Sequence, residues 1–473
     1  MLAISKNPQL FLDDYLIDRL QNIRRSLQKP SKHLANPLIK QDFPWEAKMI
    51  STYGTVLHDS KTGRFRCWYL ASRGKPDVPD TPEGSTLSKY YTCYAESPDG
   101  IQWTKPMVGR GSFSGFEPHN VVIPKTHSIC VIDTPDDPNP QRRFKAAGGG
   151  VYGTSPDGIE WDMNGWRDAV GKNDTGTSVV RWNDQWLGFV RKQEWDNRPE
   201  GNLQRAVGIT KSSDFQQWTE KELTWTADEQ DGYPWSQPYG LCVSTYGDLL
   251  IGLLPLLRLE PAQGNNSVGD METQLMVSRD ARNWHRVSDR AVIFDPSHGG
   301  PIKDRAWDNN CYPSSTLMCI EDEIRIYYSG NNGRHGESKT PLGKVHEAEL
   351  RCGIGLATLQ ADRFEAMQCD NQAEQAVLQT KSFSFSGKEL LVNANLENDT
   401  DLVVEVVDEN GSIFNGLDKT ACRLQRHNAL RYRVEWQCNG ASKSLAQAVG
   451  DHRVSLRFSW MRGDLFAFQV CDI

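Results

Sequence analysis

One short string, in which serine, aspartate and tryptophan keep a fixed spacing, occurs four times in this chain. It reads SPDGIQW at 97–103, SPDGIEW at 155–161, SSDFQQW at 212–218 and SRDARNW at 278–284. The four tryptophans recur at intervals of roughly 60 residues, close to the periods that indicate propeller or solenoid repeats. The chain is therefore expected to consist of several similar units rather than one continuous core.

The segments around each string predict antiparallel sheets. Short runs rich in Val, Ile, Tyr and Phe precede each tryptophan, as in YGTVLHDSKTGRFRCWYL followed by KYYTCYAESPDGIQW. This pattern indicates three strands that lead into the repeated turn, within a four-stranded unit. In the turn, we expect the aspartate to accept hydrogen bonds from nearby amides and the glycine to supply a positive φ, while the tryptophan packs back between sheets.

A fifth, weaker unit comprises DEIRIYYSG, ELRCGIGLATL and QADRFEA, with Phe364 in place of the tryptophan. We expect the N-terminal run LFLDDYLI to pair with this last unit and close a ring, which removes an exposed edge. After MQCDNQAEQAVLQTKS, short alternating strands lack the repeated turn and suit a small β-sandwich. The predicted fold is all-β: a five-bladed β-propeller at 1–368, followed by a C-terminal β-sandwich at 369–473.

Composition excludes several classes of function. The net charge of -8 and the scattered Lys and Arg give no basic surface for nucleic acid. No apolar run reaches the roughly 18 residues of a membrane span, and the N-terminus lacks a signal-peptide pattern. The eleven cysteines form no CxxC pair, which favours reduced thiols in a cytoplasmic protein. The many aromatic residues in a polar chain, 15 Trp, 14 Tyr and 16 Phe, fit either sugar binding or β-rich packing.

With these repeats and this tail, the chain resembles the five-bladed β-propeller glycoside hydrolases of families 32, 43, 62 and 68. Their S-x-D-x-x-x-W strings close blades, and family 32 also has a C-terminal β-sandwich. The resemblance implies hydrolysis of a glycoside by carboxylic acids. The family 32 segments WMNDPNG, RDP and EC are absent from this sequence, so the resemblance assigns no catalytic residue by motif.

Candidate acids are found just before the first strand of each unit, because such segments converge at one mouth of a propeller. The segments are FPWEAKMISTYGTV, GFEPHNVVI, GKNDTGTSVVRW, DGYPWSQPYGLCV and DRAWDNNCYPSSTL. They contain Glu46, Glu117, Asp174 and Asp308. Glycoside cleavage needs one protonated and one ionised carboxyl group. We predict that Asp174 and Glu46 are the working pair and that Asp308 modulates them or binds the sugar, whereas Glu117 either binds substrate or caps a turn.

Basic and aromatic residues near these segments are candidates for substrate binding. The basic candidates are His119, Arg143, Arg191, Arg205, Arg334 and His335, and the aromatic candidates are Tyr233, Trp235 and Trp307. Arginines orient carboxylates or bind an anionic sugar, and aromatic rings stack on sugar rings. The alternatives are structural ion pairs for the arginines and packing at the rim for the aromatic residues.

The sequence thus predicts a glycoside hydrolase that releases a terminal sugar from an oligosaccharide or glycoside. Two alternatives stay open: a non-catalytic carbohydrate-binding or interaction propeller, and a lyase, phosphorylase or transferase on the same scaffold. No cofactor is expected, and a solvated turn is favoured over Ca²⁺ binding for the loop DTPDDPNP. The expected partner is a carbohydrate, with neither nucleic acid nor membrane, and the sequence does not specify an oligomeric state.

Overall fold

The computed structural model describes residues 2–74, 90–148, 151–163, 177–195, 203–261, 266–296, 300–398, 401–438 and 440–473. About 50 % of the chain is strand and 7 % is helix, so the fold is all-β, as predicted. The two short α-helices are α1 (Pro341–Val345) and α2 (Leu445–Val449). None of the helices in the described ranges has the length and apolar sequence needed to span a bilayer.

Five antiparallel sheets follow one another along the chain between residues 49 and 360. Sheet 1 contains β6 (Met49–Asp59), β7 (Arg64–Ser72), β8 (Tyr91–Ser97) and β9 (Val121–Ile123). Sheet 2 contains β10 (Cys130–Asp133), β11 (Phe144–Gly148) and β12 (Val151–Ser155). Sheet 3 contains β13 (Ser178–Trp182), β14 (Gln185–Trp195), β15 (Leu203–Ser212) and β16 (Glu222–Trp225). In these three sheets, strands that are consecutive in the sequence are also neighbours in the sheet.

The fourth and fifth sheets have an interrupted first strand. Sheet 4 contains β17 (Ser236–Pro238), β18 (Cys242–Tyr246), β19 (Leu249–Leu259), β20 (Gly269–Ser278), β21 (His285–Arg286) and β22 (Val292–Phe294). Sheet 5 contains β23 (Asn310–Pro313), β24 (Met318–Ile320), β25 (Glu323–Asn331) and β26 (Cys352–Gln360), with β4 (Ser31–Lys32) and β5 (Ile39–Lys40) at its edge. Both β17 and β18 pair with β19, and both β23 and β24 pair with β25.

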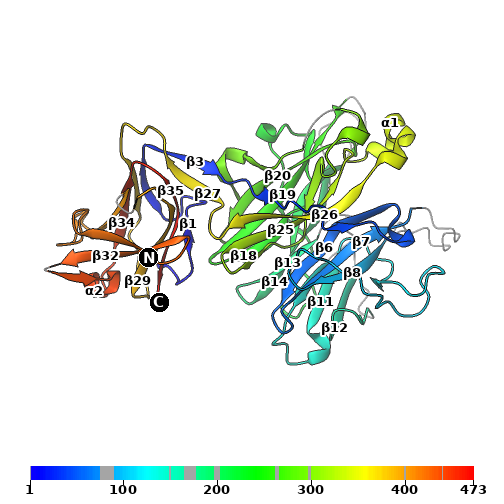
Figure 1. Ribbon diagram of the computed structural model, residues 1–473, viewed down its shortest axis with the longest axis horizontal. Coiled ribbons are helices and arrows are strands. Elements are labelled where there is room, and N and C mark those ends of the chain that lie inside the picture. The colour runs from blue at the N-terminus through cyan, green and yellow to red at the C-terminus, as the bar shows by residue number, and fades with distance from the viewer. Residues whose placement is uncertain are drawn as a thin grey trace.

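The five sheets form a propeller-like ring around a common centre (Figure 1). Strand β6 contacts β10, β10 contacts β13, β13 contacts β18, and β23 of sheet 5 contacts sheet 4, while β25 and β26 of sheet 5 contact β6. Small hydroxyl groups link these first strands. Thr55 Oγ1 lies 2.6 Å from Ser315 Oγ and accepts from the Val131 amide, and Ser178 Oγ bonds to the backbone of Val243 and Ser315. Short side chains at the centre therefore let the first strands approach one another closely.

Two further sheets form the other lobe of Figure 1, where both termini lie. One contains β1 (Gln9–Leu10), β3 (Ile23–Leu27), β27 (Glu365–Cys369), β29 (Glu389–Asn395), β31 (Cys422–Arg426), β32 (Arg431–Cys438), β33 (Ala441–Lys443) and β35 (Asp464–Cys471). The other contains β2 (Ile17–Gln21), β28 (Ala376–Thr380), β30 (Leu402–Val407) and β34 (Ser455–Trp460). Side chains of both sheets, including Val404, Trp436, Phe458 and Phe468, share one buried core.

The prediction for LFLDDYLI is wrong. Its first residues pair with β35 and its last residue begins β2, which pairs with β28, so this run belongs to the C-terminal lobe. The edge of sheet 5 is covered instead by β4 and β5, which pair with β26. The N-terminal segment thus crosses from one lobe to the other, and ring closure is achieved by two very short strands.

The repeated strings are turns that follow the third strand of a sheet, as predicted. In each turn the aspartate accepts from two backbone amides, as Asp157 does from Ile159 and Glu160 at 2.9 and 2.8 Å. The turn also contacts the preceding sheet of the ring. Trp68 of sheet 1 donates through Nε1 to the Gly158 carbonyl at 2.6 Å. The repeat therefore connects neighbouring sheets, and it serves as part of the scaffold.

Candidate functional site

Irregularities in the first strands place three tyrosines at the centre of the ring. The register of β6 shifts between Ser51 and Thr55, and Tyr53 lies within this bulge. Tyr239 occupies the gap between β17 and β18, where its amide donates to the Pro255 carbonyl at 2.7 Å. Tyr312 lies in β23 just before the next gap. Bulges and strand breaks commonly redirect side chains near functional sites, and here they direct the tyrosines toward one another.

The tyrosine rings pack as a connected group. The ring centroids of Tyr53 and Tyr312 lie 4.6 Å apart, those of Tyr239 and Tyr312 lie 5.5 Å apart, and those of Tyr53 and Tyr239 lie 6.4 Å apart. The ring of His127, from the segment before β10, lies 5.6 Å from Tyr53 in an edge-on arrangement. Sheets 1, 2, 4 and 5 thus each supply at least one aromatic ring.

Sheet 3 contributes two arginines to the same group. The guanidinium of Arg191 lies 5.0 Å from the Tyr239 ring centroid, and that of Arg205 lies 5.5 Å from it. Arg205 also donates to Gln237 Oε1 at 2.8 Å and to the Asn266 carbonyl at 2.7 Å. These bonds fix the direction of the Arg205 side chain, so its position does not depend on the contact with the tyrosine alone.

His335 completes the group through a hydrogen bond. Its Nε2 atom lies 2.8 Å from the hydroxyl oxygen of Tyr239, and the two rings are edge-on at 4.7 Å. Residues from sheets 1, 3 and 5 therefore meet around Tyr239 of sheet 4, and His127 from the segment before sheet 2 contacts Tyr53. We call this group the central site: Tyr53, His127, Arg191, Arg205, Tyr239, Tyr312 and His335.

The central site is deeply set but not closed. Tyr239 is 8 % exposed and Tyr312 is 6 % exposed, whereas Tyr53 and His335 are half-buried. Burial raises the pKa of Tyr53 well above its usual range, and the neighbouring Tyr239 and Tyr312 raise it further. The Tyr53 phenol is therefore neutral and donates hydrogen bonds. The site combines aromatic surfaces, phenolic donors and guanidinium groups, a set that suits a hydroxyl-rich ligand.

The predicted carboxylates do not meet in the described part of the chain. Asp174 lies outside the described residues. Glu117 is exposed, and the segment GFEPHNVVI that contains it leads into β9, the outermost strand of sheet 1, so it is not at the centre. Asp308 is 6 % exposed and accepts from Lys32 Nζ at 2.7 Å and from the Tyr328 hydroxyl at 2.8 Å. The catalytic and binding roles of these residues stay predictions.

Glu46 lies in the short turn Pro44–Glu46, before β6, and its side chain is fully buried. Its carboxylate accepts from Lys105 Nζ at 2.8 Å, from the Tyr69 hydroxyl at 2.5 Å and from the amides of Asp42 and Phe43 at 2.8 and 3.2 Å. The Lys105 side chain is only 7 % exposed. These contacts are those of a structural ion pair that satisfies a buried charge. The predicted catalytic role of Glu46 is untested, and its surroundings give it a clear structural role.

The remaining basic candidates divide between the central site and ion pairs elsewhere. Arg143 pairs with Asp59 and Asp133 at 2.6 and 2.8 Å. Arg334 pairs with Glu260 at 2.8 Å and with Asp270 at 2.9 Å. Of the predicted substrate-binding residues, the structure therefore gathers only Arg191, Arg205 and His335 around Tyr239.

The other aromatic candidates and His119 lie in packed surroundings. Trp307 stacks on Tyr328 at 5.8 Å, Trp235 is half-buried against the core of sheets 4 and 5, and Tyr233 is half-buried before a cis proline. His119 is 3 % exposed, and its ring lies 3.1 Å from the Gly111 carbonyl through Nε2.

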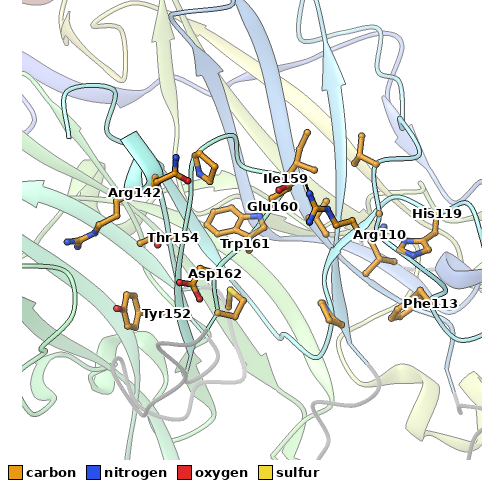
Figure 2. Close-up of a pocket in the computed structure, with 18 of the residues that line it drawn as sticks. Arg110, Phe113, His119, Arg142, Tyr152, Thr154, Ile159, Glu160, Trp161 and Asp162 are labelled. Carbon is orange, nitrogen blue, oxygen red and sulfur yellow. Dashed lines mark hydrogen bonds and ion pairs between the residues drawn. The ribbon is translucent and has the colours of Figure 1, made fainter. Parts of the chain in front are cut away.

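A hollow lies on the outer side of sheets 1 and 2 (Figure 2). It has a volume of about 1230 Å³. In Figure 2, Trp161 lies in the middle, with Arg142 and Tyr152 on one side and Arg110 and His119 on the other. We call it the outer groove. Trp161 belongs to the repeated turn, where its Nε1 donates to the Gly158 carbonyl at 3.0 Å.

Sequence reasoning missed Tyr53, His127, Tyr239 and Tyr312. Three of them nevertheless lie inside segments that it selected: FPWEAKMISTYGTV contains Tyr53, DGYPWSQPYGLCV contains Tyr239 and DRAWDNNCYPSSTL contains Tyr312. Each of the three segments contains a tyrosine, and this shared residue type was the signal that could have identified the site. His127 precedes β10, the true first strand of sheet 2, which the predicted segment for that sheet does not reach.

No protein-family model matches the chain, and no curated protein sequence matches it. Among solved structures, a β-1,2-mannobiose phosphorylase from Listeria innocua is 11 % identical, covers 70 % of this chain and 97 % of its own, and has a TM-score of 0.44. A GH32 β-fructofuranosidase from Bombyx mori is 10 % identical, covers 95 % and 94 %, and has a TM-score of 0.36. A glycoside hydrolase is 14 % identical, covers 70 % and 92 %, and has a TM-score of 0.39. The chain is similar to these solved structures, and values this low assign it neither a family nor residue roles nor a substrate.

Proposed function

We propose that this protein is a glycoside hydrolase that binds its sugar at the central site and releases a terminal residue. In this proposal the five sheets are the blades of a five-bladed propeller and the other lobe is a β-sandwich. The predicted division into 1–368 and 369–473 does not separate the two lobes, because β1, β2, β3 and β27 belong to the sheets of the sandwich. The observation that carries the proposal is the convergence of side chains from sheets 1, 3 and 5 on Tyr239 of sheet 4. A cytoplasmic location and the absence of a cofactor are part of the proposal.

The chemistry of the central site supports a sugar ligand. The half-buried face of Tyr53 offers an apolar surface to the C–H groups of a pyranose or furanose ring. The Tyr312 hydroxyl and the Arg205 guanidinium offer donors to its hydroxyl oxygens. Cleavage also needs a carboxylic acid to protonate the leaving oxygen. We assign that role to Asp174, which lies four residues before β13 in the sequence.

The test is release of sugar from a broad panel of oligosaccharides and aryl glycosides by the full-length protein. We expect Arg205→Ala to lower kcat/KM about 100-fold, because each lost charged hydrogen bond costs about 1.5–3 kcal/mol. Asp174→Asn should abolish turnover. The matched control is Arg110→Ala in the outer groove, which should retain activity within about twofold.

Other outcomes separate the alternatives. If the wild-type protein releases no sugar from any glycan but binds one, it is a binding module. Two guanidinium groups, 5.0 and 5.5 Å from the Tyr239 ring centroid, also suit a phosphate ion, which favours phosphorolysis as a second candidate reaction. Turnover that requires inorganic phosphate and yields a sugar phosphate identifies a phosphorylase, whereas turnover in phosphate-free buffer identifies a hydrolase.

A further inference from the structure

The hydrogen bond between Tyr239 and His335 has a defined direction. His335 Nδ1 bonds to the backbone carbonyl of Ser267, and a carbonyl oxygen only accepts. Nδ1 therefore carries a proton. In the neutral imidazole Nε2 is then the acceptor, so the Tyr239 hydroxyl donates to Nε2 across the 2.8 Å distance.

The backbone around His335 is built to hold this arrangement. The amide and carbonyl of His335 bond to those of Gly269 at 3.0 and 3.2 Å. Gly336 has a φ of +70°, and a Cβ atom at this position would lie 2.5 Å from the Ser267 carbonyl oxygen. Only glycine therefore lets the Ser267 carbonyl approach closely enough to fix the imidazole.

Two guanidinium groups and two phenol groups face the pair. Arg191 and Arg205, from β14 and β15, lie over the Tyr239 ring at 5.0 and 5.5 Å and stabilise negative charge that develops on its oxygen. From β6 and β23, Tyr53 and Tyr312 contribute neutral phenol groups beside the same ring.

Two further basic residues near the Tyr239–His335 pair, His127 and Arg334, contact other groups. His127, which precedes β10, faces Tyr53 rather than Tyr239. Arg334, the residue before His335, pairs with Glu260 and Asp270. The described cations nearest to the Tyr239 ring are therefore Arg191 and Arg205.

We infer that Tyr239 is a catalytic proton-transfer residue of the central site and that His335 is the positioning residue that receives its proton. This inference rests on the proposed hydrolase function and adds a second kind of catalytic group to the predicted carboxylic acid. It differs from a pair of carboxylates because the base is a phenol coupled to an imidazole.

The reaction step balances without a further reactant. The water oxygen bonds to the anomeric carbon as the bond from that carbon to the leaving oxygen breaks. The water proton moves to the Tyr239 oxygen while the tyrosine proton moves to Nε2 of His335, which becomes an imidazolium. The carboxylic acid, assigned to Asp174, gives its proton to the leaving oxygen. Solvent then removes the proton from His335 and restores the one on the acid.

The experiment compares steady-state kinetics of the wild-type protein with Tyr239→Phe and His335→Gln on the best substrate of the glycan panel. Tyr239→Phe should lower kcat by about 10²–10⁴-fold with little change in KM, the range for loss of general acid–base catalysis. The matched control is Tyr327→Phe, which also removes a buried hydroxyl that donates at 2.8 Å, here to the Gly100 carbonyl, and it should retain kcat.

The pH profile separates proton transfer from a structural role. Wild-type kcat should fall on the acidic side, between about pH 8 and 5, because protonated His335 no longer accepts the tyrosine proton. His335→Gln keeps an oxygen acceptor for the hydroxyl but takes up no proton, so it should lose this acidic limb together with most of kcat. If Tyr239→Phe retains kcat within threefold, or if His335→Gln keeps the wild-type profile, the inference is wrong while the hydrolase function stands. If the wild-type protein cleaves no glycan, both fall.

Discussion

The central site and the outer groove differ in how the chain builds them. The outer groove draws most of its lining from two neighbouring sheets, and its middle is occupied by Trp161 of a repeated turn (Figure 2). The central site draws one or two side chains from each of five sheets. The groove is lined in part by a repeated turn, whereas the residues of the central site lie outside that turn.

This difference teaches where function resides in a repeat protein. Residues that recur in each unit, such as the aspartate of the turn, solve the same packing problem several times. Tyr239 has counterparts in Tyr53 and Tyr312, but these tyrosines lie outside the repeated turn and at bulges or breaks in the strands. The three predictions below test that division, from the largest expected effect to the smallest.

Glu46 lies in neither the central site nor the outer groove, and its replacement tests whether its role is structural. Glu46→Gln removes the buried anionic partner of Lys105 and leaves it only the exposed Asp42, at 2.9 Å. This change should lower the free energy of unfolding by about 3 kcal/mol, the lower end for a broken buried ion pair. Urea unfolding measures the loss. The control is Glu160→Gln, which breaks the exposed ion pair with Arg110 and should cost less than about 1 kcal/mol. Unchanged stability with lost activity would instead assign Glu46 to catalysis.

Gly158 tests whether the turn at the outer groove is structural. Its φ is +75°, and a Cβ atom would lie 2.6 Å from the ring of the fully buried Trp68. Gly158→Ala should therefore cost about 2–4 kcal/mol of stability, from backbone strain and overpacking together. Gly111→Ala isolates the strain, because Gly111 has a φ of +64° and open space around it. Equal losses in the two variants would mean that packing against Trp68 contributes nothing.

Asp157 gives the smallest effect and a defined pH dependence. Partial burial opposes its ionisation, but hydrogen bonds from the Glu160 and Ile159 amides outweigh this and lower its pKa. A lowered pKa in the folded state adds stability above the unfolded value of about 3.9, which is lost as the pH falls through the folded value. Asp157→Asn should thus be less stable than wild type at pH 7. The difference in free energy of unfolding between the two proteins should become smaller below about pH 4. A difference that grows in acid would contradict this account.

The sequence predicts the scaffold well because the scaffold is local. The aspartate of each turn bonds to amides two and three residues ahead, so a string of seven residues contains the whole interaction. The position of the third strand before each turn follows from the same pattern. The strand pairing of LFLDDYLI was not predictable in this way, because its partner strands β28 and β35 lie more than 300 residues away in the sequence.

The sequence predicts which segments contribute to the candidate site, but it does not predict which residues within those segments do so. DGYPWSQPYGLCV was selected correctly and contains both Trp235 and Tyr239. The two side chains pack in one hydrophobic core, and Tyr239 also contacts Tyr53 and Tyr312. The gap between β17 and β18 determines the direction of the Tyr239 side chain. This gap depends on hydrogen bonds to β19 and to neighbouring sheets. The bulge that contains Tyr53 is likewise fixed by partners in sheets 2 and 5. Such contacts between distant segments leave no local signature.

The central claim is that the substrate binds where the five sheets meet. The most direct measurement is a crystal structure of the Tyr239→Phe protein with an oligosaccharide that the wild type cleaves. We predict a sugar ring against Tyr53 and Tyr312, with a hydroxyl group in hydrogen-bond contact with Arg205. An oligosaccharide bound only on Trp161 in the outer groove, with the central site empty, would contradict the account.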